Sequence, residues 1–409
     1  MEKLSIILGK SVQALSKIRG GGSALPGLVV EKTSPNFLRK TLAKLPHGVI
    51  VISGTNGKTT TTKIVSELLE KQGLKVFTNK TGSNFVRGII SAILQDIKLS
   101  GKFDYDIAVL ELDEAHAVRF SEQAPINYSL FLNVQRDQLD RFGEIDHTAE
   151  LLQKVADATQ NAIILNREDP RVAKLTGKNP QFFGLSDALL KKFPSDDTLL
   201  GGDKKKSNYY AKVVFEKLKG NTASYRINDK LYDAQLKLRG SYNAYNAAGA
   251  LALCMAVLPK AKIEDMVRDL QSIESAFGRG ETFRVDDVDI EVLLVKNPSA
   301  FQLSLANFVD DEHDYMICIN DRVADGRDVS WLWNVDFSAL PKVSFCSGIR
   351  ATDMALRLKY DEVKVEHIDE DINVAIDRFL HSNKKPKRIF ATYTAMLEIR
   401  KEISGKSIL

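Results

Sequence analysis

The residues best suited to chemistry form a short glycine-flanked segment, Gly54-Thr-Asn-Gly-Lys-Thr-Thr60. The apolar run Val49–Ile52 directly before it predicts a buried parallel strand. The periodic apolar residues after it predict a helix that ends at Gly73. A strand, a tight loop and a helix in this order point backbone N–H groups and the positive end of a helix at one place, which suits the phosphates of a nucleotide.

This loop is predicted to bind ATP together with Mg²⁺. Lys58 is expected to reach the β- and γ-phosphate oxygens, and the Thr59 hydroxyl is expected to bind the metal. The loop is shorter than the common phosphate loop, because Ile52 stands where that pattern has its first glycine. A Gly-Lys-Thr sequence also occurs by chance on surface turns, but the order of strand, loop and helix favours the nucleotide site. The predicted nucleotide-binding residues of the loop are Gly54, Thr55, Asn56, Gly57, Lys58, Thr59 and Thr60.

Strand and helix patterns alternate after the loop, which predicts an α/β fold with a doubly wound parallel sheet. Ligands of such sheets bind outside the carboxyl ends of the strands. The strand expected at 106–112 ends in Glu111, Asp113 and Glu114. A carboxylate there would complete the coordination of Mg²⁺ together with Thr59. Glu111 is the predicted ligand, although acids at strand ends are often simply solvated. Further strands of this sheet are expected at 74–79, 128–133 and 162–166.

Composition limits the class of protein. The chain has 409 residues, of which 44% are hydrophobic and 27% are charged, as in a soluble globular protein of two or three domains. The net charge of +4 is too small to argue for nucleic acid. Cys254, Cys318 and Cys346 are widely spaced with no CxxC pair, so we expect buried thiols, no disulfide framework and no zinc site.

The N-terminal region carries a local excess of positive charge. Residues 1–45 contain eight lysines and arginines but only two glutamates. This excess suits contact with an anionic membrane surface, and it equally suits a solvated helical face. The apolar patch at 4–8 is too short for an export signal, and no apolar run is long enough to span a membrane. We therefore expect a cytoplasmic protein, with the inner face of the membrane as a further location.

Later segments supply two more candidate sites. Asn243 and Asn246 begin an apolar helix at 243–255 with i,i+3 spacing, which suits both the reading of an adenine edge and the capping of the helix. The segment 277–283 has glycines on both sides of Arg279, which predicts a hinge whose arginine swings toward the γ-phosphate. The strands expected after position 200 lie at 212–216 and 224–227, which form a hairpin, and at 290–295, 315–320, 343–346, 363–367 and 388–392.

Several of these stretches together resemble the Mur ligases. They are GTNGKTTT, the strand end ELDE, NVQRDQLDRFGEID, NREDP, GSYNAYNAA before the apolar helix, and FGR at the hinge. Within that superfamily, LPGLVVEK, LVKNPSAFQ and INDRVADGRDVSWLWNVDF resemble the MurT family of ligase subunits. The resemblance covers nearly the whole chain, and ADGRDVSW is its most specific part. One departure is the region 184–210, where many MurT proteins carry a four-cysteine zinc ribbon and this chain has no cysteine.

The resemblance implies a domain organisation and a reaction. It implies a short helical region at 1–46, a central ATP-binding domain at 47–278 with a variable insert, and a C-terminal α/β domain at 279–409. The implied reaction is ATP-dependent amidation of the D-glutamate α-carboxylate in the lipid II stem peptide, which gives D-isoglutamine in peptidoglycan synthesis. A carboxylate is a poor electrophile, so the γ-phosphoryl group of ATP would first form an acyl phosphate, with Lys58, the Thr59–Glu111 pair and Arg279 offsetting the developing charge.

The ammonia must come from another protein if the resemblance holds. No cysteine here has the sequence context of a glutaminase nucleophile. The resemblance implies a GatD-type glutaminase subunit in a heterodimer, with Asp328 completing its catalytic triad by orienting the histidine. Two alternatives remain. An amino-acid-adding Mur or folylpolyglutamate ligase would hydrolyse ATP in response to an amino acid, but such Mur enzymes carry a UDP-binding domain before the phosphate loop. A non-catalytic nucleotide-binding scaffold would not need Lys58 for amidation.

Overall fold

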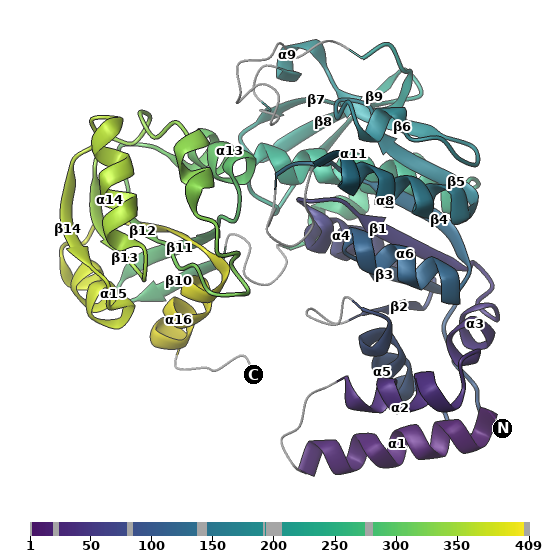
Figure 1. The fold of residues 1–409 in the computed structure, drawn as a ribbon. Coiled ribbons are helices and arrows are strands. Elements are labelled where there is room, and N and C mark those ends of the chain that lie inside the picture. The colour runs from purple at the N-terminus through teal and green to yellow at the C-terminus, as the bar shows by residue number, and fades with distance from the viewer. Residues whose placement is uncertain are drawn as a thin grey trace.

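The computed structural model describes residues 2–18, 24–79, 85–136, 145–190, 193, 207–274 and 281–404. It consists of an N-terminal group of helices, a large central sheet with helices on both faces, and a second, smaller α/β part (Figure 1). Among the helices in these ranges, none is long and apolar enough to cross a bilayer. The N-terminal helices are α1 (Glu2–Ile18), α2 (Leu25–Thr33) and α3 (Phe37–Leu42).

The central sheet has nine strands in the order β2-β3-β1-β4-β5-β6-β7-β8-β9. Neighbours from β2 to β7 pair in parallel, and β7, β8 and β9 pair antiparallel. The fold class predicted for this region is therefore confirmed, with an antiparallel extension at one edge. The strands are β1 (Val49–Ser53), β2 (Val76–Thr78), β3 (Ile107–Glu111), β4 (Ile126–Phe131), β5 (Thr159–Asn166), β6 (Gln181–Leu185), β7 (Ala211–Lys219), β8 (Thr222–Ile227) and β9 (Lys230–Gln235).

Both faces of this sheet are buried, which explains why β1 is apolar without alternation. Ile50 and Ile52 pack into the core on one face, and Val49 and Val51 pack into the core on the other. Side chains of successive strand residues point to opposite faces, so a strand covered on both sides needs apolar residues throughout. The helices and short 3₁₀ turns are α4 (Lys58–Lys71), α5 (Val86–Asp96), α6 (Glu114–Gln123), α8 (Ile145–Ala158), η1 (Val172–Lys174), α9 (Asp187–Leu190), α11 (Ser241–Val257), α12 (Ile263–Asp269) and η2 (Leu270–Ser272).

The C-terminal sheet has six strands in the order β10-β11-β15-β12-β13-β14. All neighbours are parallel except β10 and β11, whose hairpin turns at Asp286 and Asp287 with φ values of 45° and 67°. Aspartate is one of the few non-glycine residues that adopt such angles readily. The strands are β10 (Glu281–Val285), β11 (Val288–Leu294), β12 (Asp314–Cys318), β13 (Val343–Ser347), β14 (Val365–Asp369) and β15 (Lys387–Ala391), and the helices are α13 (Pro298–Phe308), η3 (Ser330–Asn334), α14 (Ala351–Tyr360), α15 (Ile372–His381) and α16 (Tyr393–Ser404).

Three strands are absent from the sequence-based prediction. The expected hairpin at 212–216 and 224–227 is confirmed as β7 and β8, but β9 adds a third antiparallel strand. The sequence prediction also lacked β6 and β10. Of the cysteine-free insert, the structure describes α9, Phe193 and the two ends, and the glycine- and lysine-rich part at 201–206 lies outside the described residues.

Candidate functional site

The phosphate loop connects β1 to α4 through two glycines in positive-φ conformations. Gly54 has φ +128° and Gly57, at the N-cap position of α4, has φ +91°. A Cβ atom on Gly57 would lie 2.7 Å from Asn246 Oδ1, and one on Gly54 would lie 2.9 Å from the Asn133 carbonyl oxygen. Both positions therefore require glycine for backbone conformation and for space.

The side chain of Lys58 folds back onto the phosphate loop. Its Nζ donates to the carbonyl oxygen of Gly54 at 2.7 Å and forms an ion pair with Asp113 Oδ1 at 3.1 Å. Burial alone would raise the pKa of the Asp113 carboxyl, but the charges of Lys58, Lys296 and His116 outweigh it and hold that pKa below its usual value. Asp113 therefore stays ionised beside Lys58 at neutral pH. The sequence singled out Asp113 as one of three acids, but not as the partner of this lysine.

Thr59 and Glu111 meet, as predicted from their positions. The Thr59 hydroxyl donates to Glu111 Oε1 at 2.9 Å, and Glu111 is only 8% exposed at the end of β3. Asn79 fixes this strand end, since its side chain accepts from the Glu111 N–H and donates to the Glu111 carbonyl oxygen, both at 2.9 Å. One hydroxyl and one carboxylate match a Mg²⁺ site in which water and nucleotide oxygens supply the other ligands. Within the described ranges, no three His, Cys, Asp or Glu side chains cluster as a metal site.

Asparagine and glutamine side chains hold the loop against the ends of β4 and β5. Asn133 Oδ1 accepts from the Asn56 N–H at 2.8 Å, and the Asn56 side chain donates to Gln135 Oε1 at 2.6 Å. Asp169 accepts hydrogen bonds from three backbone N–H groups, one of them at Val134 in the segment after β4. Burial raises the pKa of Asp169 despite these hydrogen bonds. These hydrogen bonds hold the phosphate loop and the segment after β4 in place.

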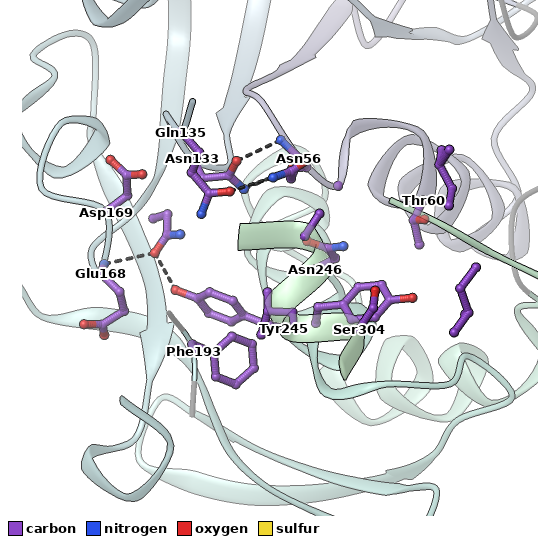
Figure 2. A pocket seen from close by; sticks show the side chains of 17 residues that line it. Asn56, Thr60, Asn133, Gln135, Glu168, Asp169, Phe193, Tyr245, Asn246 and Ser304 are labelled. Carbon is purple, nitrogen blue, oxygen red and sulfur yellow. Dashed lines mark hydrogen bonds between the residues drawn. The ribbon is translucent and has the colours of Figure 1, made fainter. Parts of the chain in front are cut away.

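A cavity of about 130 Å³ opens beside the loop, between the central sheet and the C-terminal part. Figure 2 shows Asn246 between Asn56 of the phosphate loop and Tyr245, with Phe193 of the insert nearby. Apolar side chains of the C-terminal part, from β11 and α13, line the opposite wall. A cavity with aromatic rings, aliphatic walls and a few amides suits a flat heteroaromatic ring such as adenine. The lining residues are Asn56, Gly57, Thr60, Asn133, Gln135, Asn166, Glu168, Asp169, Phe193, Tyr242, Tyr245, Asn246, Leu293, Leu294, Ala300, Leu303 and Ser304.

The two candidate adenine residues differ in position. Asn246 lines the cavity, whereas Asn243 is not among the lining residues and donates from Nδ2 to the Arg239 carbonyl oxygen at 2.7 Å. The alternative prediction, that these asparagines cap the helix, is wrong for α11. Its N-cap is Gly240, and no side chain forms a capping hydrogen bond there. The adenine role of both asparagines stays a prediction, and Asn246 has the better position for it.

The C-terminal part contacts the phosphate loop directly. Asn56 and Asn297 exchange two amide hydrogen bonds, at 3.1 and 3.0 Å, and Lys296 Nζ donates to the Thr55 carbonyl oxygen at 3.0 Å. Asn297 is positioned by α13, whose N-cap it forms by accepting from the Ala300 N–H. Lys296 and Asn297 follow β11 at the carboxyl end of the second sheet, and no local sequence pattern indicates that they reach the first sheet.

Asp328 lies at the surface beside a second cavity. Its carboxylate is exposed and accepts from the Ser330 N–H at 2.8 Å. Asp325, three residues earlier, is instead buried and accepts from the backbone N–H of Thr394 at 2.7 Å, which anchors the loop. The second cavity has a volume of about 60 Å³, and its lining residues include Asp328 as well as Arg136, Lys296 and Asn297. A single hollow therefore adjoins both Asp328 and the residues that touch the phosphate loop.

Two predicted features cannot be placed. Arg279 and most of the expected hinge at 277–283 lie outside the described residues. The role of Arg279 stays a prediction, and most of the stretch that follows β4 in the family resemblance, at 137–144, is also outside the described residues. The residues that sequence reasoning missed at the site are mainly uncharged: Asn79, Asn133, Gln135, Tyr242 and Tyr245.

The three cysteines are expected to be inert, as buried thiols. Cys254, Cys318 and Cys346 are all buried and reduced, and burial raises the pKa of each thiol, that of Cys346 to about 12. A raised pKa keeps the thiol protonated at pH 8, and the thiolate is the reactive form. We expect the folded chain to react with a water-soluble disulfide reagent at pH 8 at least about a hundredfold more slowly than the urea-unfolded chain. Fast labelling of Cys346 in the folded chain would contradict this expectation.

Comparison with known proteins identifies relatives over nearly the whole chain. The family model for the Mur ligase middle domain matches residues 52–254, and the model for the MurT ligase C-terminal region matches 294–396. The MurT subunit of lipid II isoglutaminyl synthase (glutamine-hydrolyzing) from Staphylococcus aureus strain COL is 31% identical over 90% of this chain and 89% of that protein. Its counterpart from Streptococcus pneumoniae strain R6 is 29% identical over 99% and 98%.

Solved structures agree on the fold. The MurF ligase of Thermotoga maritima in complex with ADP superimposes with a TM-score of 0.68 at 20% identity, covering 92% of this chain and 84% of that one. A pseudomurein peptide ligase type C from Methanothermus fervidus gives a TM-score of 0.67 at 17% identity, over 88% and 79%. At these identities the likeness establishes the architecture alone.

Proposed function

This chain belongs to the MurT family, and from this premise we propose that it is the ATP-dependent ligase subunit of a lipid II isoglutaminyl synthase. In this role it amidates the α-carboxylate of D-glutamate in the lipid II stem peptide and so forms D-isoglutamine. Glutamine supplies the nitrogen through a GatD-type glutaminase that pairs with this chain as a heterodimer. The observation that carries the proposal is the junction of β1 and α4, where two obligatory glycines, Lys58 and the Thr59–Glu111 pair converge.

The nucleotide site follows from that junction. The N–H groups at the start of α4 and the Lys58 ammonium suit the phosphates of ATP, and the cavity beside Asn246 and Tyr245 suits its adenine. Thr59 and Glu111 would hold Mg²⁺, which would neutralise charge on the phosphates when bound. Arg279, on the segment between the two sheets, would add a further positive charge at the γ-phosphate.

The chemistry requires activation of the acceptor. Direct attack of ammonia on a carboxylate would have to expel oxide, so the carboxylate first takes the γ-phosphoryl group of ATP, with release of ADP, and becomes an acyl phosphate. Ammonia then displaces phosphate and leaves the amide. Charge spreads over the transferring phosphoryl group during the first step, and in this proposal the Lys58 ammonium offsets that charge.

The proposed source of ammonia, a separate glutaminase, gives Asp328 its role. An exposed aspartate at a loop tip can complete a Cys-His pair of a neighbouring chain, because its task is to orient the imidazole and not to carry the proton. The cavity that adjoins Asp328 also adjoins Lys296, whose ammonium touches the phosphate loop. Ammonia released near Asp328 would thus enter next to a residue that contacts the phosphate loop. The lipid-linked acceptor further places the enzyme at the inner face of the membrane, in peripheral contact with it.

The decisive experiment uses the chain co-purified with its glutaminase. Lipid II is incubated with Mg-ATP and either glutamine or an ammonium salt, and the product is weighed by mass spectrometry. Replacement of one oxygen by NH, dependent on ATP and supported by both nitrogen sources, is the expected result. ATP hydrolysis that responds to an added amino acid in place of ammonia would instead identify an amino-acid-adding ligase.

The metal role of Glu111 has its own test. We expect Glu111→Gln to raise the Mg²⁺ concentration for half-maximal amidation about tenfold, because an amide keeps the shape but loses the charge that attracts the cation. The measurement is a magnesium titration at saturating ATP. Glu67→Gln is the matched control, since Glu67 lies further along α4 and forms a partly exposed ion pair with Lys63 at 3.5 Å. An unchanged magnesium dependence in the Glu111 variant would remove this residue from the metal site.

A further inference from the structure

Helix α1 packs through one face only. Ile6 is fully buried, and a Cβ atom on Gly9 would lie 2.6 Å from Val30 Cγ2 of α2, so the helices are in close contact there. Lys10 Nζ donates to the Leu94 carbonyl oxygen at 2.6 Å and Gln13 Nε2 to the Ser91 carbonyl oxygen at 3.2 Å, which ties the same face to α5. Figure 1 shows α1 at the edge of the molecule, outside α2 and α5.

The opposite face of α1 is apolar and exposed. Leu4, Ile7, Leu8 and Leu15 are 71%, 50%, 43% and 58% exposed, and their spacing places them on one side of the helix. We call these four residues the outer stripe. A surface helix normally presents charged and polar residues to water, so a helix with apolar residues on both faces needs a second partner.

Charge identifies the kind of partner. The first 45 residues carry eight lysines and arginines against two glutamates. Lys10 is held by the end of α5, and Glu31 pairs with Arg87 at 2.7 Å, which offsets one of the two acids. Lys3, beside the outer stripe, and Lys32 on α2 are exposed. Apolar side chains bordered by positive charge match the interface of an anionic bilayer, where acyl chains meet negative head groups.

A second copy of the chain suits this surface less well. In a twofold dimer the same surface meets itself, so the positive charges around one stripe would face those around the other. The proposed glutaminase contact lies elsewhere, because Asp328 belongs to the C-terminal part, whereas α1 packs against α2 and α5 (Figure 1).

We propose that the outer stripe of α1 docks the enzyme on the anionic surface of a lipid bilayer. Leu4, Ile7, Leu8 and Leu15 enter the head-group region while Lys3 beside them contacts lipid phosphates. This inference rests on the proposed function in one respect, since a lipid-anchored acceptor gives the enzyme a reason to bind membranes. The contact concentrates the enzyme in the plane in which its acceptor diffuses.

Vesicle flotation with the full chain tests the inference. The chain is expected to float with vesicles of phosphatidylglycerol and phosphatidylcholine and to float much less with phosphatidylcholine alone. The double variant Leu4→Gln/Ile7→Gln is expected to bind the anionic vesicles at least about tenfold more weakly. Glutamine keeps the helix propensity high, and both side chains point away from the core, so the fold is retained.

A matched control separates the stripe from general surface hydrophobicity. The double variant Leu231→Gln/Ile368→Gln removes two apolar side chains, 53% and 53% exposed, from β9 and β14, and is expected to bind vesicles like the original chain. Equal binding of the α1 variant and the original chain, or no vesicle binding by the original chain, would overturn the inference. So would light scattering that shows a dimer of the original chain which the α1 variant abolishes.

Activity measurements keep this inference apart from the proposed function. With the glutaminase present and the precursor in detergent micelles, the α1 variant is expected to amidate at the original rate, whereas on vesicle-embedded precursor it should be slower. Failure of the original chain to amidate in micelles would refute the proposed function. Amidation in micelles without any binding of the original chain to vesicles would refute only the docking surface.

Discussion

Replacing Lys58 by alanine is expected to lower ATP-dependent amidation by about two to three orders of magnitude, the usual cost of removing one group that stabilises charge in the transition state. Lys58 is the cation nearest the loop carbonyls, with its Nζ 2.7 Å from the Gly54 oxygen. The loss should appear in kcat with glutamine and with ammonium alike, because the step that fails precedes the arrival of nitrogen. The measurement is initial-rate kinetics with lipid II, using the chain co-purified with its glutaminase.

Two further variants make the Lys58 result specific. Lys58→Met keeps the aliphatic stem and should lose activity as Lys58→Ala does, which excludes a packing defect. Lys63→Ala removes a lysine of the same helix whose partner is Glu67 at 3.5 Å, and it should leave activity within about twofold, as expected for a surface ion pair. Unchanged amidation in Lys58→Ala would favour a scaffold that binds nucleotide without using it.

The second large effect is expected at Asp328. Asp328→Asn should keep ATP binding and ammonium-dependent amidation but lower glutamine-dependent amidation by about four orders of magnitude, as for the aspartate of a catalytic triad. The asparagine side chain is nearly isosteric and its Oδ1 still accepts from the Ser330 N–H, so the loop should retain its conformation. The measurement compares amidation by one enzyme preparation with the two nitrogen sources.

Asp353→Asn is the control for Asp328. Asp353 lies on α14 and, like Asp328, lines a third cavity of the C-terminal part. It pairs with Arg350 at 2.9 Å, so its replacement removes a nearby negative charge without changing the proposed triad. Glutamine-dependent amidation should stay within about twofold of normal in this variant. Normal glutamine-driven turnover in Asp328→Asn would end the proposed role. An equal loss with glutamine and with ammonium would point to a folding defect instead.

Local sequence patterns were sufficient to predict the phosphate loop and its neighbouring strand and helix. The β1–loop–α4 unit could be read directly, because a buried parallel strand is continuously apolar and the loop glycines interrupt it at once. The meeting of Thr59 with Glu111 was also predictable. Ile52 pairs in register with Glu111, and neighbouring parallel strands end at the same edge.

Other features depend on contacts that no local pattern encodes. The cavity beside Asn246 takes walls from α11, from Phe193 in the insert and from α13, three segments far apart in sequence. Asp113 pairs with Lys58, and Glu111 accepts from Thr59. Which acid near the end of β3 meets which residue depends on the path of the backbone after the strand, which the sequence pattern does not reveal. Strand β9 was missed because its sequence, KLYDAQ, is polar, as is common for a strand at the edge of a sheet.

The reciprocal amide pair of Asn56 and Asn297 has a consequence for turnover. The pair joins the C-terminal part to the phosphate loop through neutral groups. A hydrogen bond of this kind contributes only about 1 kcal/mol net to the stability of such a contact. Such a pair costs little to open and, because both groups are neutral, depends on ionic strength less than a surface ion pair does. Separation of the two parts at the phosphate loop is therefore expected to respond little to the salt concentration.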